Sequence, residues 1–331
     1  MADALTAAGH DVSLYAGWHS LERPVYRLTP HLARDALDLL IYHHSCGCLE
    51  IDGVFADAPY PKAIKSHNVT PLAFFEPGGP EYRSCAIAFG QTARLLGRAD
   101  AVWADSAFNR DELVALRPGL ACDVIPPFHR VEELLRHPPD LTVAARVDLA
   151  VPTALVVGRV VPNKDAVTAV EAVADYNRRH GPLRLVVAGD DAHPYADEVR
   201  AAAARHALGD RFALTGKVPR ARLATLYRLA DVLLAPSRHE GFCVPLIEAM
   251  AFGVPVVARP AAALRETGAG VARFCDGGPA EWADAVRGVL AAPSGYAAAG
   301  RRRFADRYRI DAIRSDFLAA VGRLIPRGGR P

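Results

Sequence analysis

Lysine is scarce in this sequence. The only lysines are at positions 62, 65, 164 and 217, although the chain carries 39 basic residues in all. The formal net charge is +2, so no overall basic or acidic excess points to a nucleic acid as the partner. Because lysine is so rare, each of the four is a candidate for a specific role.

Cysteine and long apolar runs are also limited. The six cysteines are scattered, and the one close pair, Cys46 and Cys48, has no second pair to complete a zinc framework. We interpret them as reduced thiols of a cytosolic protein rather than as disulfides or metal ligands. No signal peptide is visible, and no apolar run approaches the roughly 20 residues that span a bilayer. These features predict a soluble, cytoplasmic protein.

Short aliphatic runs alternate with helical patterns along the chain, which predicts βα units around parallel sheets. The expected strands cover 11–17, 37–45, 62–69, 99–106, 122–127, 153–160, 183–190, 211–218, 231–237 and 253–259. The clearest helical patterns cover 165–180, 194–207, 219–230 and 244–252.

The length of 331 residues allows two cores, and the Pro-rich segment 138–152 is typical of a linker. We therefore predict a first α/β domain over 1–140 and a second α/β domain over 151–310, both doubly wound. A helix and tail over 311–331 would follow, and this helix could cross back to the first domain.

The beginning of the chain does not fit this plan. The stretch "MADALTAAGHDVSLYAG" reads as the end of a helix followed by a strand. A doubly wound domain normally begins with a strand and a glycine-containing turn before that helix. We therefore expect the first domain to lack its first strand, and we favour a misassigned or truncated start.

Two cations follow the first strand of the second domain. Arg159 and Lys164 stand in "GRVVPNK", on the loop at the carboxyl end of that strand, where open α/β sheets bind ligands. A planar guanidinium and a mobile ammonium suit a diphosphate. Taken alone, an Arg/Lys pair is more often part of a solvated loop.

Glycines mark the next two strand ends. "AGDD" places Gly189 after one strand, and "LTGKVP" places a glycine before Lys217 and Val218 after the other. Glycine allows a ligand to approach the backbone closely. A flat base could lie there against main-chain groups near Lys217 and Val218.

Two glutamates flank an apolar segment in "SRHEGFCVPLIEAMAFGVPVV". Pro245 suits the first turn of a helix, so the N–H groups of Gly241, Phe242 and Cys243 would face a phosphate at the helix N-terminus. We add Val244, at the expected start of the helix, to this binding set. The carboxylates of Glu240 and Glu248 could grip sugar hydroxyls on either side of a diphosphate, although acids near a helix start are also favoured by the helix dipole.

Residues 153–259 resemble the donor domain of the family 4 retaining glycosyltransferases, which have the GT-B fold of two Rossmann-like domains. The resemblance rests on "GRVVPNK" and on the two glutamates separated by seven residues. It implies that Arg159 and Lys164 bind the donor diphosphate, Glu240 the transferred sugar and Glu248 the ribose. It also implies that the Gly241 and Phe242 amides touch sugar or phosphate. Cys243 stands where the family usually has glycine.

The first half is similar to the family's acceptor domain, more loosely. "KAIKSHNVTP" puts His67 at a strand end, where the family commonly has a histidine that contacts the transferred sugar. A lone histidine at a strand end is often structural, but this location favours a functional role. His43 and His44 alternate faces of their strand, so at most one of them points into the cleft. We interpret Ser106 first as the cap of the following helix.

No Asp-x-Asp motif occurs, so we predict no metal, with Arg159, Lys164 and the helix N-terminus stabilising the leaving diphosphate. The resemblance implies a hexosyltransferase of class EC 2.4 that needs no cofactor beyond its nucleotide-sugar donor. His67, Glu240, Arg159 and Lys164 are the catalytic candidates, and Glu240 is not expected to be a nucleophile. The acceptor could be a small molecule, a lipid-linked sugar or a polysaccharide, with at most a peripheral membrane contact. An isomerase, epimerase or phosphorylase on the same fold, or an inactive nucleotide-sugar-binding protein, are the alternatives.

Overall fold

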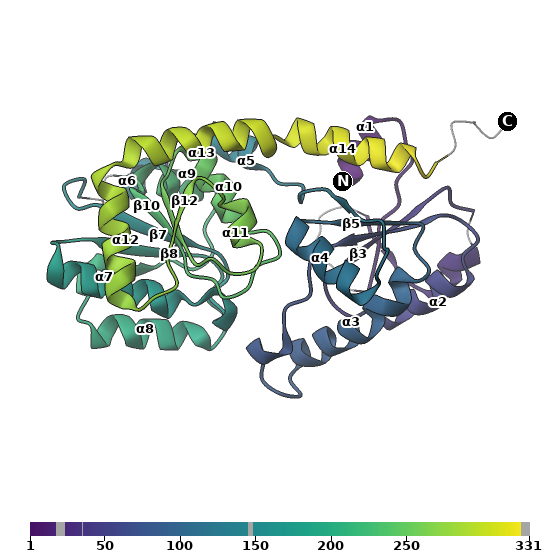
Figure 1. The fold of residues 1–331 in the computed structure, drawn as a ribbon, viewed down its shortest axis with the longest axis horizontal. Coiled ribbons are helices and arrows are strands. Elements are labelled where there is room, and N and C mark those ends of the chain that lie inside the picture. The colour runs from purple at the N-terminus through teal and green to yellow at the C-terminus, as the bar shows by residue number, and fades with distance from the viewer. Residues whose placement is uncertain (18–23, 35, 145–147, 326–331) are drawn as a thin grey trace. The chain divides into compact units, whose positions relative to one another are not determined.

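The computed structural model describes the chain apart from residues 18–23, 35, 145–147 and 326–331. The chain forms two compact units: unit 1 is Met1–Phe128 with Asp311–Pro331, and unit 2 is His129–Ile310. Each unit contains a parallel sheet with helices packed against it (Figure 1). Among the described residues, no helix is both long enough and apolar enough to cross a membrane.

Unit 2 is built on a six-stranded parallel sheet in the order β12-β11-β10-β7-β8-β9. The strands are β7 (Thr153–Val157), β8 (Arg184–Ala188), β9 (Phe212–Leu214), β10 (Val232–Ala235), β11 (Val256–Ala258) and β12 (Ala272–Phe274). The chain runs outward from β7 in one direction as far as β9 and then restarts on the other side of β7 with β10. Such a reversal opens a crevice beyond the carboxyl ends of β7 and β10, which is the usual ligand position in this type of sheet.

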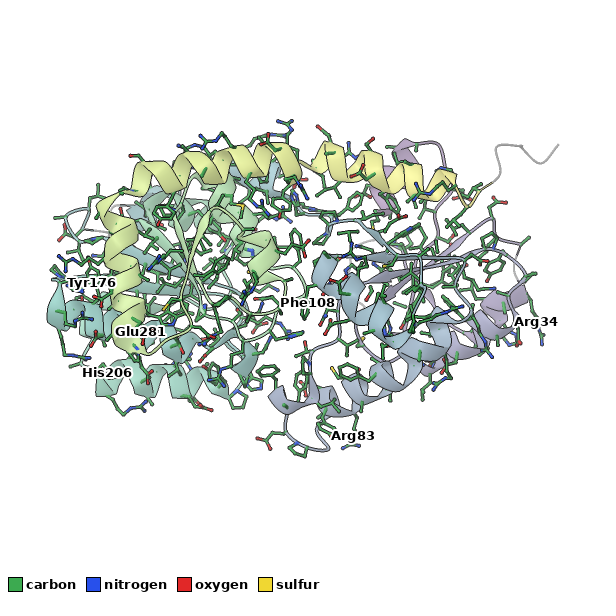
Figure 2. The ribbon with its side chains drawn as sticks, in the orientation of Figure 1. Arg34, Arg83, Phe108, Tyr176, His206 and Glu281 are labelled. Atoms are coloured by element: carbon green, nitrogen blue, oxygen red, sulfur yellow. The ribbon has the colours of Figure 1, made fainter. Side chains whose placement is uncertain are left out.

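Helices cover both faces of this sheet. Ala154 and Val156 of β7 pack in one buried cluster with α7, α8 and α12, whereas Leu155 packs in the other with α5, α9, α10 and α13. Figure 2 shows the side chains around the sheet, with Tyr176 labelled on α7 and Glu281 on α12. The helices are α5 (Val131–Arg136), α6 (Leu141–Ala144), α7 (Ala166–Arg179), α8 (Tyr195–Arg205), α9 (Arg220–Leu229), α10 (Val244–Phe252), α11 (Leu264–Thr267), α12 (Pro279–Ala291) and α13 (Pro293–Arg307).

Unit 1 contains a four-stranded parallel sheet in the order β3-β4-β5-β6. Ile64 and Val102 pack with α2 and α3 on one face, and Ala63 and Trp103 pack with α1 and α14 on the other. The Trp103 ring meets Phe317 of α14 edge to face, with 5.6 Å between the ring centroids. The elements are β3 (Leu40–His44), β4 (Lys62–Ser66), β5 (Ala101–Ala104), β6 (Asp123–Val124), α1 (Ala2–Ala7), α2 (Leu49–Asp57), α3 (Pro80–Leu96), α4 (Ala107–Leu116) and α14 (Ile310–Gly322).

The strands expected in the second half are confirmed, because each predicted range contains one of β7 to β11. The strand expected over 11–17 is much shorter. Only β1 (Tyr15–Ala16) forms there, and it pairs with β2 (Tyr26–Arg27) outside the four-stranded sheet. A parallel strand covered on both faces needs a nearly continuous apolar run, and "DVSLYAG" is interrupted by an aspartate and a serine.

The boundary between the units falls earlier than the sequence suggested. Residues 129–140, assigned above to the first domain, belong to unit 2, because Val131 and Leu134 of α5 pack among α9 and α10. The expected linker 138–152 contains α6, and residues 145–147 lie outside the described part. The helix expected after 311 is α14 and is part of unit 1, and the last six residues of the predicted tail are not described.

Candidate functional site

Three glycines lie side by side at the carboxyl ends of β7, β8 and β9. The Gly158 N–H donates to the carbonyl of Ala188 over 3.0 Å, and the Gly189 N–H donates to the carbonyl of Gly216 over 3.1 Å. Their φ angles are 143°, 157° and 64° for Gly158, Gly189 and Gly216. This row exposes bare backbone at the sheet edge where a ligand is expected.

We expect Gly189→Ala to disrupt this edge. A Cβ at Gly189 would lie 1.8 Å from the carbonyl oxygen of Gly158, and its φ of 157° is one that alanine avoids. The free energy of unfolding of unit 2 should fall by about 3 kcal/mol, measured by urea unfolding. Gly288→Ala is the matched control in the same unit, because that Cβ meets nothing within 4 Å inside a helix and should stabilise by roughly 0.5–1 kcal/mol. Equal effects of the two substitutions would contradict the close approach.

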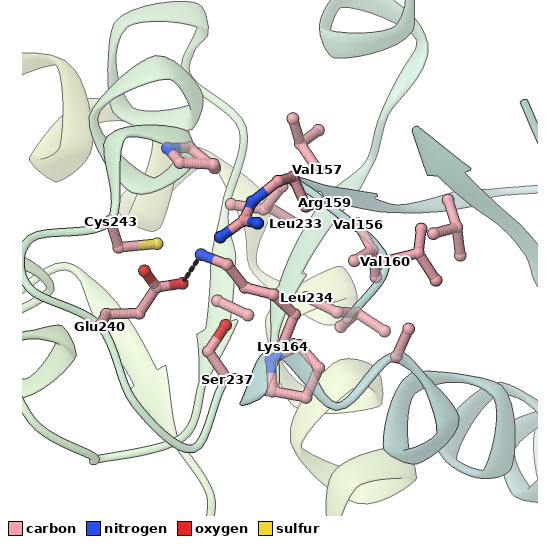
Figure 3. Close-up of a pocket in the computed structure, with 16 residues that line it drawn as sticks. Val156, Val157, Arg159, Val160, Lys164, Leu233, Leu234, Ser237, Glu240 and Cys243 are labelled. Atoms are coloured by element: carbon pink, nitrogen blue, oxygen red, sulfur yellow. Dashed lines mark hydrogen bonds and ion pairs between the residues drawn. The ribbon is translucent and has the colours of Figure 1, made fainter. Parts of the chain in front are cut away.

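A pocket lies at the strand reversal, between the loops that follow β7 and β10. Arg159, Lys164 and Glu240 line it, and Lys164 Nζ lies 2.5 Å from Glu240 Oε1. Figure 3 shows the Arg159 guanidinium beside this ion pair, and it has no hydrogen-bond or ion-pair partner within the described residues. Glu240 is only 8% exposed, so without a ligand Lys164 neutralises the buried acid, and the Arg159 guanidinium is already available to an anion.

Asp165 ties together the loops that form this pocket. It is buried, sits in the left-handed region with φ 53°, and immediately follows Lys164. Its Oδ2 accepts hydrogen bonds from Arg238 Nε over 2.9 Å and from Arg259 Nη2 over 3.1 Å. The loops after β7, β10 and β11 are thereby linked. Sequence analysis did not single out Asp165, although an acid at the first position of the helical pattern 165–180 was the available signal.

The N-terminus of α10 supplies the remaining wall of the pocket. Cys243 caps the helix with φ 74° and ψ 76°, and it lines the pocket with Pro245 of the first turn. Burial, followed by the nearby Glu240 carboxylate, raises the pKa of the Cys243 thiol well above its usual value. The thiol is therefore neutral, and the positive end of the helix dipole can act on an anion in the pocket.

The left-handed backbone at Cys243 predicts which substitutions this position tolerates. Glycine relieves a left-handed conformation by about 1 kcal/mol, which offsets the packing lost with the buried thiol. Cys243→Gly should therefore change the free energy of unfolding by less than about 1 kcal/mol. Cys243→Val should cost more than about 2 kcal/mol, because β-branched residues are strongly disfavoured at positive φ. Urea unfolding of both variants tests this order, and a valine tolerated as well as glycine would refute it.

Glu248 lies one turn into α10 and is not among the residues that line the pocket. Its Oε2 accepts a hydrogen bond from the hydroxyl of Tyr227 over 2.7 Å. Burial raises the pKa of Glu248, and the hydrogen bond from Tyr227 opposes that rise. The buried phenol therefore orients the carboxylate. Whether Glu248 binds a ribose stays a prediction.

The other predicted donor residues are not among those that line the pocket. Lys217 is exposed at the end of β9, and Val218 is half-buried against the α9–α10 cluster. Phe242 is buried, with its ring edge-on to Tyr308 at a centroid distance of 5.6 Å. Gly241 precedes it, and Val244 is the first residue of α10. The structure thus gathers Arg159, Lys164, Glu240 and Cys243 in one pocket, with Gly189 on the neighbouring glycine row.

His67 occupies a strand end in unit 1 and belongs to a polar chain that sequence analysis did not foresee. Its Nδ1 lies 2.9 Å from Asp105 Oδ2, and its Nε2 lies 2.8 Å from Nδ1 of His43. Lys65, with a fully buried side chain, is paired with Asp105. Asn68 follows with φ 68°, a strained conformation of the kind found at functional sites. Ser106 caps α4 through its side chain, as predicted.

His44 points to the opposite face and is buried against α3, which confirms the expected alternation with His43. The hydroxyl of Thr92 donates to the carbonyl of Ala88, so it accepts from Nε2 of His44 over 2.9 Å. The buried Nδ1 of His44 has no hydrogen-bond partner within the described chain. His44 is therefore held neutral, and burial lowers its pKa to about 4.

This histidine predicts acid sensitivity of unit 1. Because the folded pKa of His44 lies below its ordinary value, the unfolded chain takes up the proton first as the pH falls. Stability should be full above about pH 6.5 and should decline toward about pH 4. Amide hydrogen exchange of β3 across this range measures the effect. His44→Asn should remove the part of the decline due to His44 and leave that of His43, whose pKa is also lowered to about 4, and an unchanged slope would exclude His44 as a cause.

The sheet order, the helices on both faces and the anion-attracting crevice define two Rossmann-like units, the GT-B class of fold. Sucrose-phosphate synthase from Thermosynechococcus elongatus has this fold, with a TM-score of 0.78 and 20% identity over 98% of this chain and 91% of that one. The Anabaena protein HepE, solved with UDP and glucose, has a TM-score of 0.71 and 18% identity over 87% of this chain and 78% of its own.

The segment that contains the pocket also matches a protein family in sequence. Residues 145–302 match the family model described as glycosyl transferases group 1, and this segment belongs to that family. A D-inositol 3-phosphate glycosyltransferase from Segniliparus rotundus is 33% identical over 221 residues, which is 62% of this chain. The chain spans 48% of the length of that relative.

Proposed function

We propose that the chain is a retaining glycosyltransferase that moves a sugar from a nucleotide-diphosphate sugar to an acceptor hydroxyl. The observation that carries this proposal is the pocket at the strand reversal. There Arg159, Lys164 and the N-terminus of α10 surround a space that also contains the Glu240 carboxylate. Three sources of positive charge suit a leaving diphosphate, and a carboxylate suits sugar hydroxyls.

The proposed chemistry needs neither a metal nor a protein nucleophile. The two cations and the helix dipole would stabilise the charge that develops on the diphosphate as the glycosidic bond breaks. Glu240 is engaged by Lys164 at 2.5 Å, which favours a binding role over covalent attack. The acceptor hydroxyl would attack the face from which the diphosphate departs, and a phosphate oxygen would take its proton.

The structural likeness to HepE with UDP and glucose makes UDP-glucose a reasonable first donor. The Segniliparus rotundus relative is named for D-inositol 3-phosphate, which makes that polyol phosphate a reasonable first acceptor. Both assignments are proposals for this chain. We also propose that it works in the cytoplasm.

A two-stage experiment tests the function. Thermal shift with UDP-glucose, GDP-mannose and ADP-glucose identifies the donor, because a bound ligand stabilises the folded state. Nucleotide release is then measured with and without D-inositol 3-phosphate, and proton NMR of the product gives the anomeric configuration. Acceptor-stimulated release with a retained configuration, unaffected by EDTA, is expected. Binding without release would favour the inactive binding protein, an altered donor sugar would favour an epimerase, and an inverted product would refute retention.

A further inference from the structure

Lys65, Asp105, His67 and His43 form a row of polar contacts in unit 1. The buried end of this row determines which atoms donate hydrogen bonds and which accept them. Lys65 is fully buried, donates to the carbonyl of Ile125 and pairs with Asp105. Burial alone would raise the pKa of Asp105, but the hydrogen bond from His67 and the charge of Lys65 hold it below its usual value. Asp105 is therefore an ionised carboxylate, which can only accept hydrogen bonds.

With His67 in its neutral form, this sets the hydrogen positions on both histidines. Because Asp105 only accepts, Nδ1 of His67 must carry the hydrogen across the 2.9 Å contact. In neutral His67 the Nε2 is then an acceptor, so Nδ1 of His43 must donate across the 2.8 Å contact. His43 therefore has its hydrogen on Nδ1 and a lone pair on Nε2.

Within the described residues, Nε2 of His43 has no hydrogen-bond partner, so it is the open end of this row of hydrogen bonds. His43 is an exposed residue at the end of β3, whereas both ring nitrogens of His67 are engaged within the protein. We propose that Nε2 of His43 binds a hydroxyl of a sugar or polyol ligand, and that Lys65, Asp105 and His67 are positioning residues that hold it as an acceptor. This inference rests on the proposed function only for the identity of the ligand.

Protonation of His43 would turn its Nε2 from a hydrogen-bond acceptor into a donor. A proton taken up at Nε2 of His43 allows the shared Nδ1 proton to pass to Nε2 of His67, which places the positive charge beside Asp105. Among the described residues, the titratable groups that act on His43 are His67, Lys65, the α-amino group of Met1 and Asp105. Although part of His43 reaches solvent, most of its ring is surrounded by protein, and this desolvation, followed by His67 and Lys65, lowers the pKa of His43 to about 4. The acceptor should therefore persist from pH 8 down to about pH 5 and be lost below it.

The proton order can be measured without any ligand. Nitrogen-15 NMR of the imidazole rings in the full chain at pH 7.5 should show the Nδ1–H tautomer for both His43 and His67. Asp105→Asn should invert the order: the amide oxygen faces Lys65, so the NH₂ donates to His67 and His43 becomes the Nε2–H tautomer. A wild-type His43 with its hydrogen on Nε2 would overturn the proposal, even where the Asn variant does not fold.

Two substitutions of His43 separate binding from structural support. His43→Asn keeps an amide near the Nδ1 position and so keeps the bond to His67, whereas His43→Gln places its amide near Nε2. If Nε2 binds the hydroxyl, His43→Asn should weaken binding about tenfold and His43→Gln should lose less. A purely structural role gives the opposite ranking.

The source of the hydroxyl decides which measurement responds. A weakened dissociation constant for UDP-glucose with an unchanged one for UDP indicates the donor sugar, and a raised KM for D-inositol 3-phosphate indicates the acceptor. The Nε2 resonance of wild-type His43 is also followed while each compound is added. If the protein turns over no donor, the proposed function is refuted. The titration of the His43 resonance still tests the binding role of His43. No shift with either compound would overturn the binding role.

Discussion

Replacing Lys164 with methionine is expected to reduce sugar-nucleotide turnover by about 10²–10³-fold. The variant removes the cation that lies 2.5 Å from Glu240 in the pocket at the strand reversal. A leaving diphosphate would lose one of its charge-stabilising groups, and Glu240 would stay nearly buried without its counter-charge. Turnover is measured as nucleotide release at saturating donor.

The double variant Lys164→Met/Glu240→Gln separates catalysis from folding. In the double variant the side chain at position 240 is a neutral amide, so no unpaired charge is buried there. The double variant should therefore recover the stability lost by Lys164→Met. It should not recover turnover, because the cation is still missing. Arg178→Ala is the matched control, since that guanidinium is 59% exposed on α7 and, among the described residues, pairs with Asp175 alone. Lys164→Met turnover within threefold of the wild type would refute the site.

Removing the Asp105 carboxylate is expected to destabilise unit 1 by about 3–5 kcal/mol. In Asp105→Ala the ammonium of Lys65, with none of its side chain exposed, loses its only charged partner among the described residues. A buried charge without compensation is far more costly than the pair itself is stabilising. Hydrogen exchange of β4 and β5 as a function of urea measures the loss.

An exposed acid provides the comparison for Asp105. Asp111 pairs with Arg110 at the surface of α4 with 68% of its side chain exposed, so Asp111→Ala should cost less than about 1 kcal/mol. Lys65→Met added to Asp105→Ala should restore much of the lost stability, because the second change removes the stranded charge. A double variant as unstable as Asp105→Ala would show that the cost comes from lost packing instead.

Local sequence was sufficient to predict those elements whose hydrophobic pattern repeats along the chain. The aliphatic runs of unit 2 predicted β7 to β11, because strands covered on both faces must be apolar almost throughout. Arg159, Lys164 and Glu240 could be proposed together, because the carboxyl ends of parallel strands meet at one sheet edge. The position of Gly189 at that edge followed from the same rule. Pro245 likewise marked the start of α10.

Contacts between distant segments were decided only by the tertiary structure. The bond of His43 to His67 depends on the register of β3 with β4, which no local pattern specifies. Lys65 reads in the sequence as one of four rare lysines, and only folding buries it against Asp105. Short-range patterns determine which residues form strands and helices, whereas register and loop packing determine which side chains share a proton or a charge.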